Sequence, residues 1–370
     1  MRTSAINSTL CVVFCLGAAT AARAQLLNAQ FSTPTLDRWN YPFDSAPGYS
    51  ETAAVFSALG QEDAFPGFSF DQRDSQMVLA WDTGAAVPTG LGVCAYRVVG
   101  ASLTIGTTGE IPFRYDPTYD PRSTFLVGST DPDLGRSIEL YGAGFRAGWT
   151  LGAPGQEGCP VPNGYPCYYE GDIDLPGPPF GPCICKNQRF VFATDFLAGS
   201  PRDITNNIRD GFDPVPFAVG QIAGVSAGDY VFTPADVEFE VSVALPDVQR
   251  YFREAANSGR LMLSISSLQP AASVGGPGSG EYARFFTKEH PLGVEPGTGD
   301  VRWARLSLSV RLVSLVGDLN YDGTVNTSDL VELLARFGQS GTLLESDVNC
   351  DEVVNTADLV LLLSNFGRNG

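Results

Sequence analysis

The stretch DVEFEVSVAL, from Asp236 to Leu245, decides the fold class of this chain. Its apolar and polar side chains alternate strictly, with Val237, Phe239, Val241 and Val243 set against Glu238, Glu240 and Ser242. Side chains of an extended strand point to opposite faces in turn, so this spacing gathers the apolar ones on one face. The stretch therefore predicts an antiparallel strand with one buried and one exposed face.

The same period recurs on both sides of that stretch. ARLSLSVRL, which ends at Leu312, repeats it, and five further segments predict strands: 76–83, 96–106, 137–145, 189–196 and 261–266. Turn-forming Gly and Pro separate these segments, as in RYDPTYDPRS at 114–123, which predicts a turn or surface loop. We expect a mainly β fold, a jelly-roll-like antiparallel β sandwich over residues 25–312. One helix interrupts it at 245–259, with Pro246 at its start and Gly259 at its end.

Composition narrows the classes of function. The chain has 370 residues with 23 basic and 41 acidic ones, a formal charge of −18. This charge argues against a nucleic-acid partner, because Lys and Arg must neutralise the phosphates of nucleic acid. Cations are the favoured partners. The length predicts one large domain and a smaller one.

The first 24 residues have the pattern of an export signal. Arg2 gives a positive start, an apolar run follows from Leu10 to Ala19, and small residues at Ala22 and Ala24 fit a cleavage site before Gln25. A short membrane anchor is the alternative, but the run is shorter than the ~20 residues a membrane span needs. No other stretch is long enough to span a membrane. We expect a secreted protein, extracellular or at the cell surface.

Cleavage at that point leaves an even number of cysteines, which in an exported protein favours disulfides. The six are Cys94, Cys159, Cys167, Cys183, Cys185 and Cys350. Four of them lie in a Pro- and Gly-rich loop at 158–185, where two local disulfides would replace a missing core. Zinc ligation by the neighbouring thiolates of Cys183 and Cys185 is the alternative.

Near Val316 the period changes from two to 3.6. GDLNYDGTVNTSDLVELLARFG, from Gly317 to Gly338, recurs as SDVNCDEVVNTADLVLLLSNFG, from Ser346 to Gly367, with 13 of 22 positions identical. Asp and Asn occupy positions 1, 3, 5, 9 and 12 of each copy's loop, which are the ligand positions of an EF-hand calcium loop together with a backbone carbonyl at position 7. Each copy therefore predicts one calcium ion, two in all.

Each loop is followed by apolar residues at helical spacing. These are Leu330, Leu333, Leu334 and Phe337 in the first copy, and Leu359, Leu362, Leu363 and Phe366 in the second. Neither short helix can bury such a stripe alone, so we expect the two to pack against each other in antiparallel fashion. Calcium binding would then supply much of the folding free energy of residues 313–370.

The duplicated loops DLNYDGTVNTSD and DVNCDEVVNTAD, each followed by a leucine-rich helix and FG, resemble type I dockerin modules over residues 317–367. That resemblance implies a small α-helical calcium-binding module that docks on a cohesin-type protein domain. It implies calcium ligation by Asp318, Asn320, Asp322, Thr324, Asn326 and Asp329, and by Asp347, Asn349, Asp351, Val353, Asn355 and Asp358. It implies partner contact through loop positions 10 and 11, which are Thr327 and Ser328, and Thr356 and Ala357.

Two residues depart from the pattern of the first loop. Glu352 replaces the glycine of position 6, and a non-glycine residue at positive φ costs about 1 kcal/mol, so a weaker second site is expected. Cys350 at position 4 can pair with another cysteine or stay free. An alternative to docking is that calcium serves only to hold this tail together.

The sandwich carries weaker functional signals. Segments 68–83 and 285–310 loosely resemble the flanking strands of DNRLRE-type jelly-roll domains of secreted bacterial proteins, which implies carbohydrate binding in a polysaccharide-degradation context. Aromatic rings near turns can stack on sugars, yet they are also ordinary core residues. The residues concerned are Trp39, Tyr41, Trp81, Tyr115, Tyr119, Trp149, Tyr165, Tyr168 and Tyr169.

An enzyme and a structural surface protein are the alternatives to a glycan-binding sandwich. A glycoside hydrolase needs two carboxylates at one scissile bond, and the candidates are Asp71, Asp82, Glu139, Asp195, Glu238 and Glu281. No spacing selects a pair among them. The single histidine, His290, lies in a turn-like stretch without a nucleophile motif. We therefore favour a non-catalytic sandwich.

Overall fold

The computed structural model describes residues 25–41, 44, 48–63, 69–126, 131, 133–146, 148–151, 190–197, 199–271, 280–294, 299–313, 315–341 and 344–369, and the backbone of 167 and 168. The predicted export signal lies outside these residues. So do Cys159, Cys183 and Cys185 of the predicted disulfide loop, together with Tyr165 and Tyr169.

The first sheet has four antiparallel strands in the order β1 (Gln25–Phe31), β17 (Arg305–Leu312), β5 (Tyr96–Gly106) and β14 (Asp236–Glu240). The alternation that predicted β14 is confirmed, because Val237 and Phe239 are buried and the three acidic residues of the strand are exposed. In β17, Leu306, Leu308 and Val310 are likewise buried. Its pairing with β5 shifts register between Ser309 and Val310.

The second sheet is larger. Its order is β11 (Ser200–Asp203), β10 (Val191–Leu197), β7 (Ile138–Phe145), β15 (Arg260–Ser267), β4 (Gln76–Asp82) and β2 (Leu36–Asn40), and β12 (Ala218–Val219) also pairs with β7. All these pairings are antiparallel. The predicted strands at 76–83, 137–145, 189–196 and 261–266 correspond to β4, β7, β10 and β15. The prediction of a mainly β, antiparallel fold is thus confirmed.

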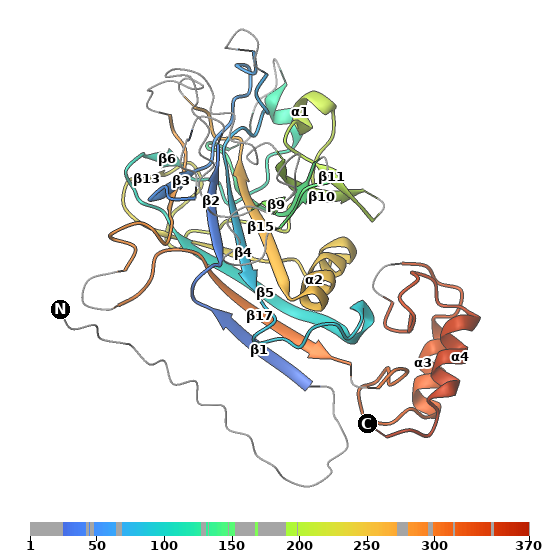
Figure 1. The fold of residues 1–370 in the computed structure, drawn as a ribbon. Coiled ribbons are helices and arrows are strands. Elements are labelled where there is room, and N and C mark those ends of the chain that lie inside the picture. The colour runs from blue at the N-terminus through green and yellow to red at the C-terminus, as the bar shows by residue number, and fades with distance from the viewer. Residues whose placement is uncertain are drawn as a thin grey trace, which may run out of the picture.

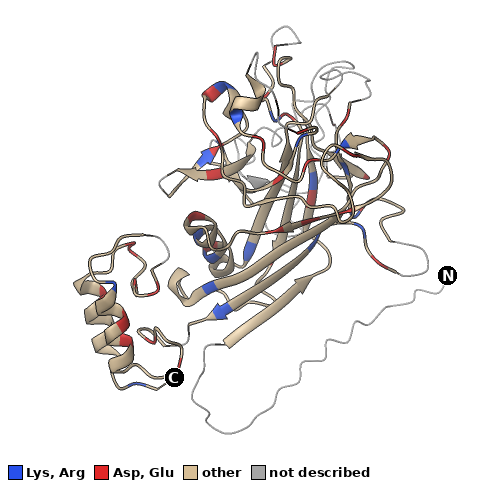
Figure 2. Cartoon of the chain, turned by 180° about the vertical axis from the view of Figure 1, so that it is seen from behind, with Lys and Arg blue, Asp and Glu red and all other residues tan. Residues whose placement is uncertain are grey.

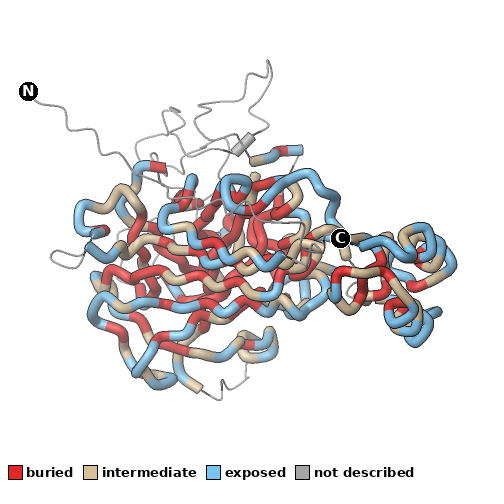
Figure 3. Tube along the Cα trace, turned by 90° about the horizontal axis from the view of Figure 1, so that it is seen from below, coloured by how far each residue is buried: buried red, intermediate tan, exposed pale blue. Residues whose placement is uncertain are grey.

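The two sheets enclose one hydrophobic core, which makes them a sandwich (Figure 1). Leu79 and Trp81 of β4 and Leu263 of β15 belong to the same buried cluster as Leu103 of β5 and Leu308 of β17. Figure 3 shows the buried positions gathered in the interior and the exposed ones mainly at the periphery. The jelly-roll connection of the strands stays a prediction.

Short elements cover the ends of the sheets. Three pairs of small strands are β6 (Phe113–Arg114) with β13 (Tyr230–Val231), β3 (Thr52–Ala54) with β16 (Arg284–Phe286), and β8 (Thr150–Leu151) with β9 (Cys167–Tyr168). The remaining short elements are the 3₁₀ turns η1 (Val93–Ala95) and η2 (Arg122–Phe125) and the helix α1 (Asn207–Asp210). The prediction for 114–123 is wrong in one respect, because this turn-rich stretch buries Asp116 and Asp120.

The helix predicted inside the sandwich is confirmed as α2 (Pro246–Ser258). Pro246 fits its first turn because a proline there forfeits no helical hydrogen bond, and Gly259 ends it at φ 79°. Val248 and Phe252 are buried in the core shared by the two sheets. The helix therefore closes one side of the sandwich, facing the C-terminal part of the chain (Figure 1).

The C-terminal segment forms two helices, α3 (Thr327–Ala335) and α4 (Thr356–Ser364). Val325 before α3 exchanges backbone hydrogen bonds with Gly367 and Arg368 after α4, and Val354 before α4 does so with Gly338 and Gln339 after α3. The start of each helix thus lies beside the end of the other, so the helices run antiparallel, as predicted. Their shared core contains Leu319, Val325, Leu333, Val354 and Leu362.

Half of the predicted apolar stripe is not buried. Leu333 and Leu362 have no exposed surface, whereas Leu334, Phe337, Leu363 and Phe366 are 44–52% exposed. The reason is that each helix contributes one narrow row to a small core that Val325 and Val354 of the loops complete.

In the described part of the chain, no helix is long and apolar enough to cross a membrane.

Candidate functional site

The first predicted calcium loop is folded around its own carboxylates. Asp318 accepts hydrogen bonds from the backbone N–H of Asp322 at 3.1 Å and of Gly323 at 2.9 Å. Asp329 closes the loop from the other end, because it accepts from the N–H of Leu319 at 2.8 Å and of Asn326 at 2.8 Å. Positions 1 and 12 are therefore both turned toward the loop interior, and both are buried.

The side chains between them converge on Asp322. The amide of Asn320 lies 3.1 Å from Asp322 Oδ2, and the amide of Asn326 lies 3.4 Å from the same oxygen. The hydroxyl of Thr324 donates to Asp322 Oδ1 at 2.6 Å. The side chains at positions 3, 5 and 9, which would be separated in an extended chain, thus lie close together.

The second loop repeats this arrangement except at position 7, where Val353 has no hydroxyl to donate. Asp347 accepts from the N–H of Asp351 at 3.1 Å and of Glu352 at 2.7 Å, and Asp358 accepts from Val348 at 2.7 Å and Asn355 at 2.9 Å. Carboxylate oxygens of Asp347, Asp351 and Asp358 lie within 4.8 Å of one another. Three carboxylate groups at this separation suit a hard divalent cation such as calcium.

Each loop also begins a helix. Asn326 and Asn355 are the N-caps of α3 and α4 and form capping boxes with Asp329 and Asp358. A capping box satisfies two amide groups that the first turn leaves without helical partners. The residues at positions 9 and 12 are thereby fixed to the helix start, which sets where their side chains point.

The pKa values of the loop carboxylates are shifted in different directions. Burial raises the pKa of Asp347 to about 6, and the charges of Asp358 and Asp351 add to the increase. Burial also raises the pKa of Asp318. Hydrogen bonds from Thr324 lower the pKa of Asp322, and one from Asn349 lowers that of Asp351. Position 1 of each loop is therefore a carboxylate, buried at Asp318 and partly buried at Asp347, whose charge an added cation would offset.

The second loop contains the strained residue that the sequence predicts. Glu352 has φ 73° at the position where Gly323 has φ 88° in the first loop. Position 4 is also left-handed in both loops, with φ 60° at Tyr321 and 58° at Cys350. The first loop thus has one non-glycine residue at positive φ and the second has two.

The residues predicted to contact a partner lie on the surface. Thr327, Ser328, Thr356 and Ala357 are exposed at the first turns of α3 and α4. One row along α3 continues from Thr327 to Val331 and Leu334, and the matching row along α4 runs from Thr356 to Val360 and Leu363. The four apolar side chains of these two rows are 49–65% exposed.

The C-terminal segment is attached to the sandwich through its second loop. Cys350 forms a disulfide with Cys94 of η1, 256 residues earlier in the chain, which resolves the two possibilities left open for Cys350. Glu345 pairs with Arg97 of β5 at 2.9 Å, and Glu352 pairs with Arg250 of α2. The sequence held one signal for this attachment, the cysteine in the loop, and no signal for Arg97 or Arg250.

A small cavity lies between the segment and the sandwich. It has a volume of about 130 Å³ and is lined by residues of both parts, among them Arg253, Tyr321 and Asp347. Burial and the neighbouring charge of Arg97 lower the pKa of Arg253. Acidic positions dominate the attached segment (Figure 2). Residues 317–369 contain nine acidic residues, Asp318, Asp322, Asp329, Glu332, Glu345, Asp347, Asp351, Glu352 and Asp358, against Arg336 and Arg368.

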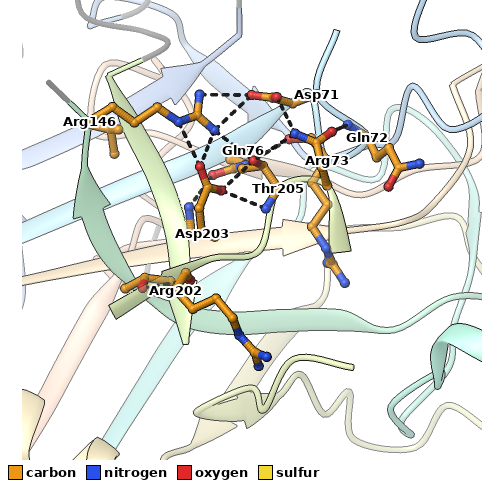
Figure 4. Close-up of polar contacts among 12 residues, drawn as sticks. Asp71, Gln72, Arg73, Gln76, Arg146, Arg202, Asp203 and Thr205 are labelled. Atoms are coloured by element: carbon orange, nitrogen blue, oxygen red, sulfur yellow. Dashed lines mark hydrogen bonds and ion pairs between the residues drawn. The ribbon is translucent and has the colours of Figure 1, made fainter. Parts of the chain in front are cut away.

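The carboxylates considered for hydrolysis have structural partners. Asp71 contacts Arg146 at 3.2 Å, and Arg146 also binds Asp203 at 2.6 Å (Figure 4). Asp195 is buried against Arg202, whose Nε lies 2.9 Å from Asp195 Oδ1.

The other four candidate carboxylates lie in different parts of the chain. Glu139 is buried against Arg73 at 2.7 Å. Glu238 is exposed on β14, and Glu281 accepts from the hydroxyl of Tyr230 at 2.7 Å. Asp82 is exposed at the end of β4 and accepts from the N–H of Gly84. His290 lies in a turn, where its Nδ1 accepts from the N–H of Leu292.

The aromatic residues considered for sugar stacking are mostly core residues. Tyr41, Trp81, Tyr115 and Trp149 are less than 10% exposed. Trp39 stacks on Tyr41 with ring centroids 4.8 Å apart, and Trp149 stacks on Phe190 at 4.5 Å. Of Tyr168 only the backbone is described. Trp39, Tyr41 and Trp149 thus pack against other rings, and Trp81 and Tyr115 belong to the hydrophobic core of the sandwich.

Comparison with known proteins gives one partial similarity. No family model matches the chain, and no curated protein matches it. A solved structure described as a type II cohesin-dockerin domain from Bacteroides cellolosolvens is 38% identical in sequence over the matched part. The match covers 15% of this chain and 92% of that one, with a TM-score of 0.15.

Proposed function

We propose that residues 317–367 form a dockerin-like module that binds two calcium ions and docks on a cohesin-type domain, and that the protein is exported and displays its sandwich through this module. The observation that carries the proposal is the repeated loop geometry. In both loops the carboxylates at positions 1 and 12 face inward and accept the same pair of backbone hydrogen bonds. Such a loop presents oxygen ligands to one hard cation.

The proposed ligands are those named from the sequence, with Thr324 and Val353 contributing their backbone carbonyl oxygens. Calcium would offset the repulsion among carboxylates that are partly buried, and so would stabilise the helix starts that share those carboxylates. Export is supported by the disulfide between Cys94 and Cys350, because disulfides persist in oxidising compartments.

Calcium binding is tested on the chain from residue 25 to 370, because the disulfide makes the sandwich part of the second loop's surroundings. Equilibrium dialysis counts bound calcium for the wild type, Asp322→Ala and Asp351→Ala. We expect each variant to bind one ion fewer than the wild type. The matched control is Asp236→Ala, which removes an exposed carboxylate of β14. Equal counts in all four proteins would refute calcium binding by the loops.

Docking is tested with an immobilised type I cohesin domain. The exposed rows of α3 and α4 have nearly the same sequence, so either row can serve as the contact surface. We expect Val331→Asp and Val360→Asp each to retain binding and the double variant to lose it. Leu197→Asp, an exposed apolar residue of β10, is the control. Binding by the double variant, or calcium-independent binding, would contradict docking through these rows.

For the sandwich we propose a displayed, non-catalytic role with polysaccharide as its candidate ligand. The arginine partners of Asp195 and Glu139 support a structural role for these two carboxylates. A pull-down on insoluble polysaccharides tests binding. Release of reducing sugar from a polysaccharide panel would instead favour the alternative, a glycoside hydrolase that carries a dockerin. A structural surface protein would give neither result.

A further inference from the structure

A second group of aspartates lies in the sandwich, outside the two loops. Asp116 and Asp120 follow β6, and Asp133 lies before β7. One carboxylate oxygen from each of the three lies within 4.8 Å of the others. Asp116 is 1% exposed and Asp120 is 6% exposed. The chain thus brings together three acidic side chains from residues 116–133 and removes two of them from water.

The hydrogen bonds of this group use one oxygen of each buried carboxylate. Asp116 Oδ1 accepts from the N–H of Thr118 at 2.8 Å and from its hydroxyl at 2.7 Å. Asp120 Oδ1 lies 3.2 Å from a guanidinium nitrogen of Arg136. Oδ2 of Asp116 and Oδ2 of Asp120 are buried and have no hydrogen-bond partner. A buried carboxylate oxygen without a partner is costly, so these two atoms indicate a missing ligand.

The positive charge near Asp116, Asp120 and Asp133 is too small to balance the negative charge of their carboxylates. Arg136 contacts Asp120 and is shared with Asp131, whose Oδ1 is also buried without a partner. Its guanidinium lies 4.2 Å from the ring centroid of Phe125. Among the described residues, Arg136 is the one arginine that forms an ion pair with this group, and it pairs with Asp120 and Asp131 but not with Asp116 or Asp133.

We propose that Asp116, Asp120 and Asp133 bind a calcium ion in the sandwich, as a site separate from the C-terminal loops. The three donors are carboxylates, with no imidazole or thiolate among them, which favours a hard cation over zinc. Calcium tolerates irregular oxygen geometry and accepts backbone and water ligands beside carboxylates, whereas magnesium requires a near-octahedral shell. The inference does not depend on the proposed function of the loops.

The site would hold a loop to the sandwich. Asp116 and Asp120 flank Tyr119, whose hydroxyl donates to Asp213 at 3.2 Å. The carbonyl of Pro117 accepts from Gln221 at 2.9 Å. A cation shared by residues on both sides of η2 would join the two ends of this loop.

The test counts calcium in the chain from residue 25 to 370 by dialysis against ⁴⁵Ca²⁺ at free concentrations up to about 1 mM, the range of extracellular calcium modules. We expect Asp120→Asn and Asp133→Asn each to bind one ion fewer than the wild type. Asp210→Asn, at an exposed position of α1, is the control and should bind as many as the wild type. The expected loss of one calcium ion does not depend on whether the C-terminal loops bind calcium. The proposed sandwich site and the proposed function of the loops can therefore fail independently.

A second measurement applies if Asp120→Asn loses its strand signal in circular dichroism. Hydrogen exchange of wild-type peptides covering 114–125 is compared in calcium and in chelator. Slower exchange in calcium, retained in the Asp322→Ala/Asp351→Ala protein, supports the site. Equal ion counts in the wild type and the folded Asp133→Asn protein, or exchange that calcium does not change, would overturn it.

Discussion

Glu352 shows how much one residue determines in a repeated loop. Position 6 requires a left-handed backbone, which glycine adopts freely and which costs a residue with a side chain about 1 kcal/mol. The chain nevertheless places Glu352 there at φ 73°, and the same side chain pairs with Arg250 of α2. The second loop thus combines a strained backbone with a contact to the sandwich that the first loop lacks at this position.

The two effects can be separated with a pair of variants. Glu352→Ala removes the ion pair and keeps the strained φ, whereas Glu352→Gly removes both the ion pair and the strain. We expect the glycine variant to be about 1 kcal/mol more stable than the alanine variant in chemical unfolding with calcium in the buffer. Gly323→Ala in the first loop is the converse control and should destabilise by a similar amount. Equal stabilities of the two Glu352 variants would show that the backbone relaxes without cost.

At the scale of elements, one side chain fixes α2 to the first sheet. Gln249 accepts from the N–H of Val98 at 2.8 Å and donates to its carbonyl at 2.7 Å. Its amide also donates to the carbonyl of Val243 at 2.9 Å. Val98 lies outside the part of β5 that pairs with β14, so the glutamine bonds backbone groups that no strand pairs on that side.

We expect Gln249→Leu to lower the free energy of unfolding by about 2–4 kcal/mol, because it leaves buried backbone groups of β5 unsatisfied while keeping the side-chain volume. Glu254→Gln, on the exposed face of the same helix, should stay within about 0.5 kcal/mol of the wild type. Urea unfolding followed by circular dichroism measures both. A loss below about 1 kcal/mol for Gln249→Leu would mean that water replaces the glutamine amide.

At the scale of the whole molecule, several contacts attach the C-terminal segment to the sandwich. The disulfide from Cys94 to Cys350, the ion pair of Arg97 with Glu345 and the guanidinium of Arg311 over the ring of Tyr321 join it to the sandwich. The second loop therefore cannot open without disturbing contacts to η1, β5 and α2. Docking through α3 and α4 would hold the sandwich in a defined orientation.

Removing the cross-link tests this coupling. We expect Cys94→Ser/Cys350→Ser to lower the free energy of unfolding by about 2–4 kcal/mol, the usual range for a disulfide that closes a long loop. We also expect faster hydrogen exchange in residues 344–369, with little change in β4 and β15. Arg305→Ala, which removes an exposed pair with Asp236, is the control and should cost less than about 1 kcal/mol. Unchanged exchange in 344–369 would show that the ion pairs alone hold the segment.

The sequence by itself determined the elements whose pattern is local. Period-two alternation located β4, β5, β7, β10, β14, β15 and β17, and Pro246 and Gly259 bounded α2. The duplicated loops and their antiparallel helices were also readable, because the spacing of Asp and Asn in each loop is a property of consecutive residues. Backbone geometry makes such patterns interpretable before any long-range contact is known.

Only the tertiary structure decided which distant residues meet. It paired Cys350 with Cys94, buried Asp116 and Asp120 in a stretch that reads as a surface turn, and left Leu334 and Leu363 exposed in helices whose stripes predict burial. The physical reason is the same in each case. Burial and charge balance depend on what packs against a residue, and those neighbours lie on elements whose arrangement no local pattern specifies.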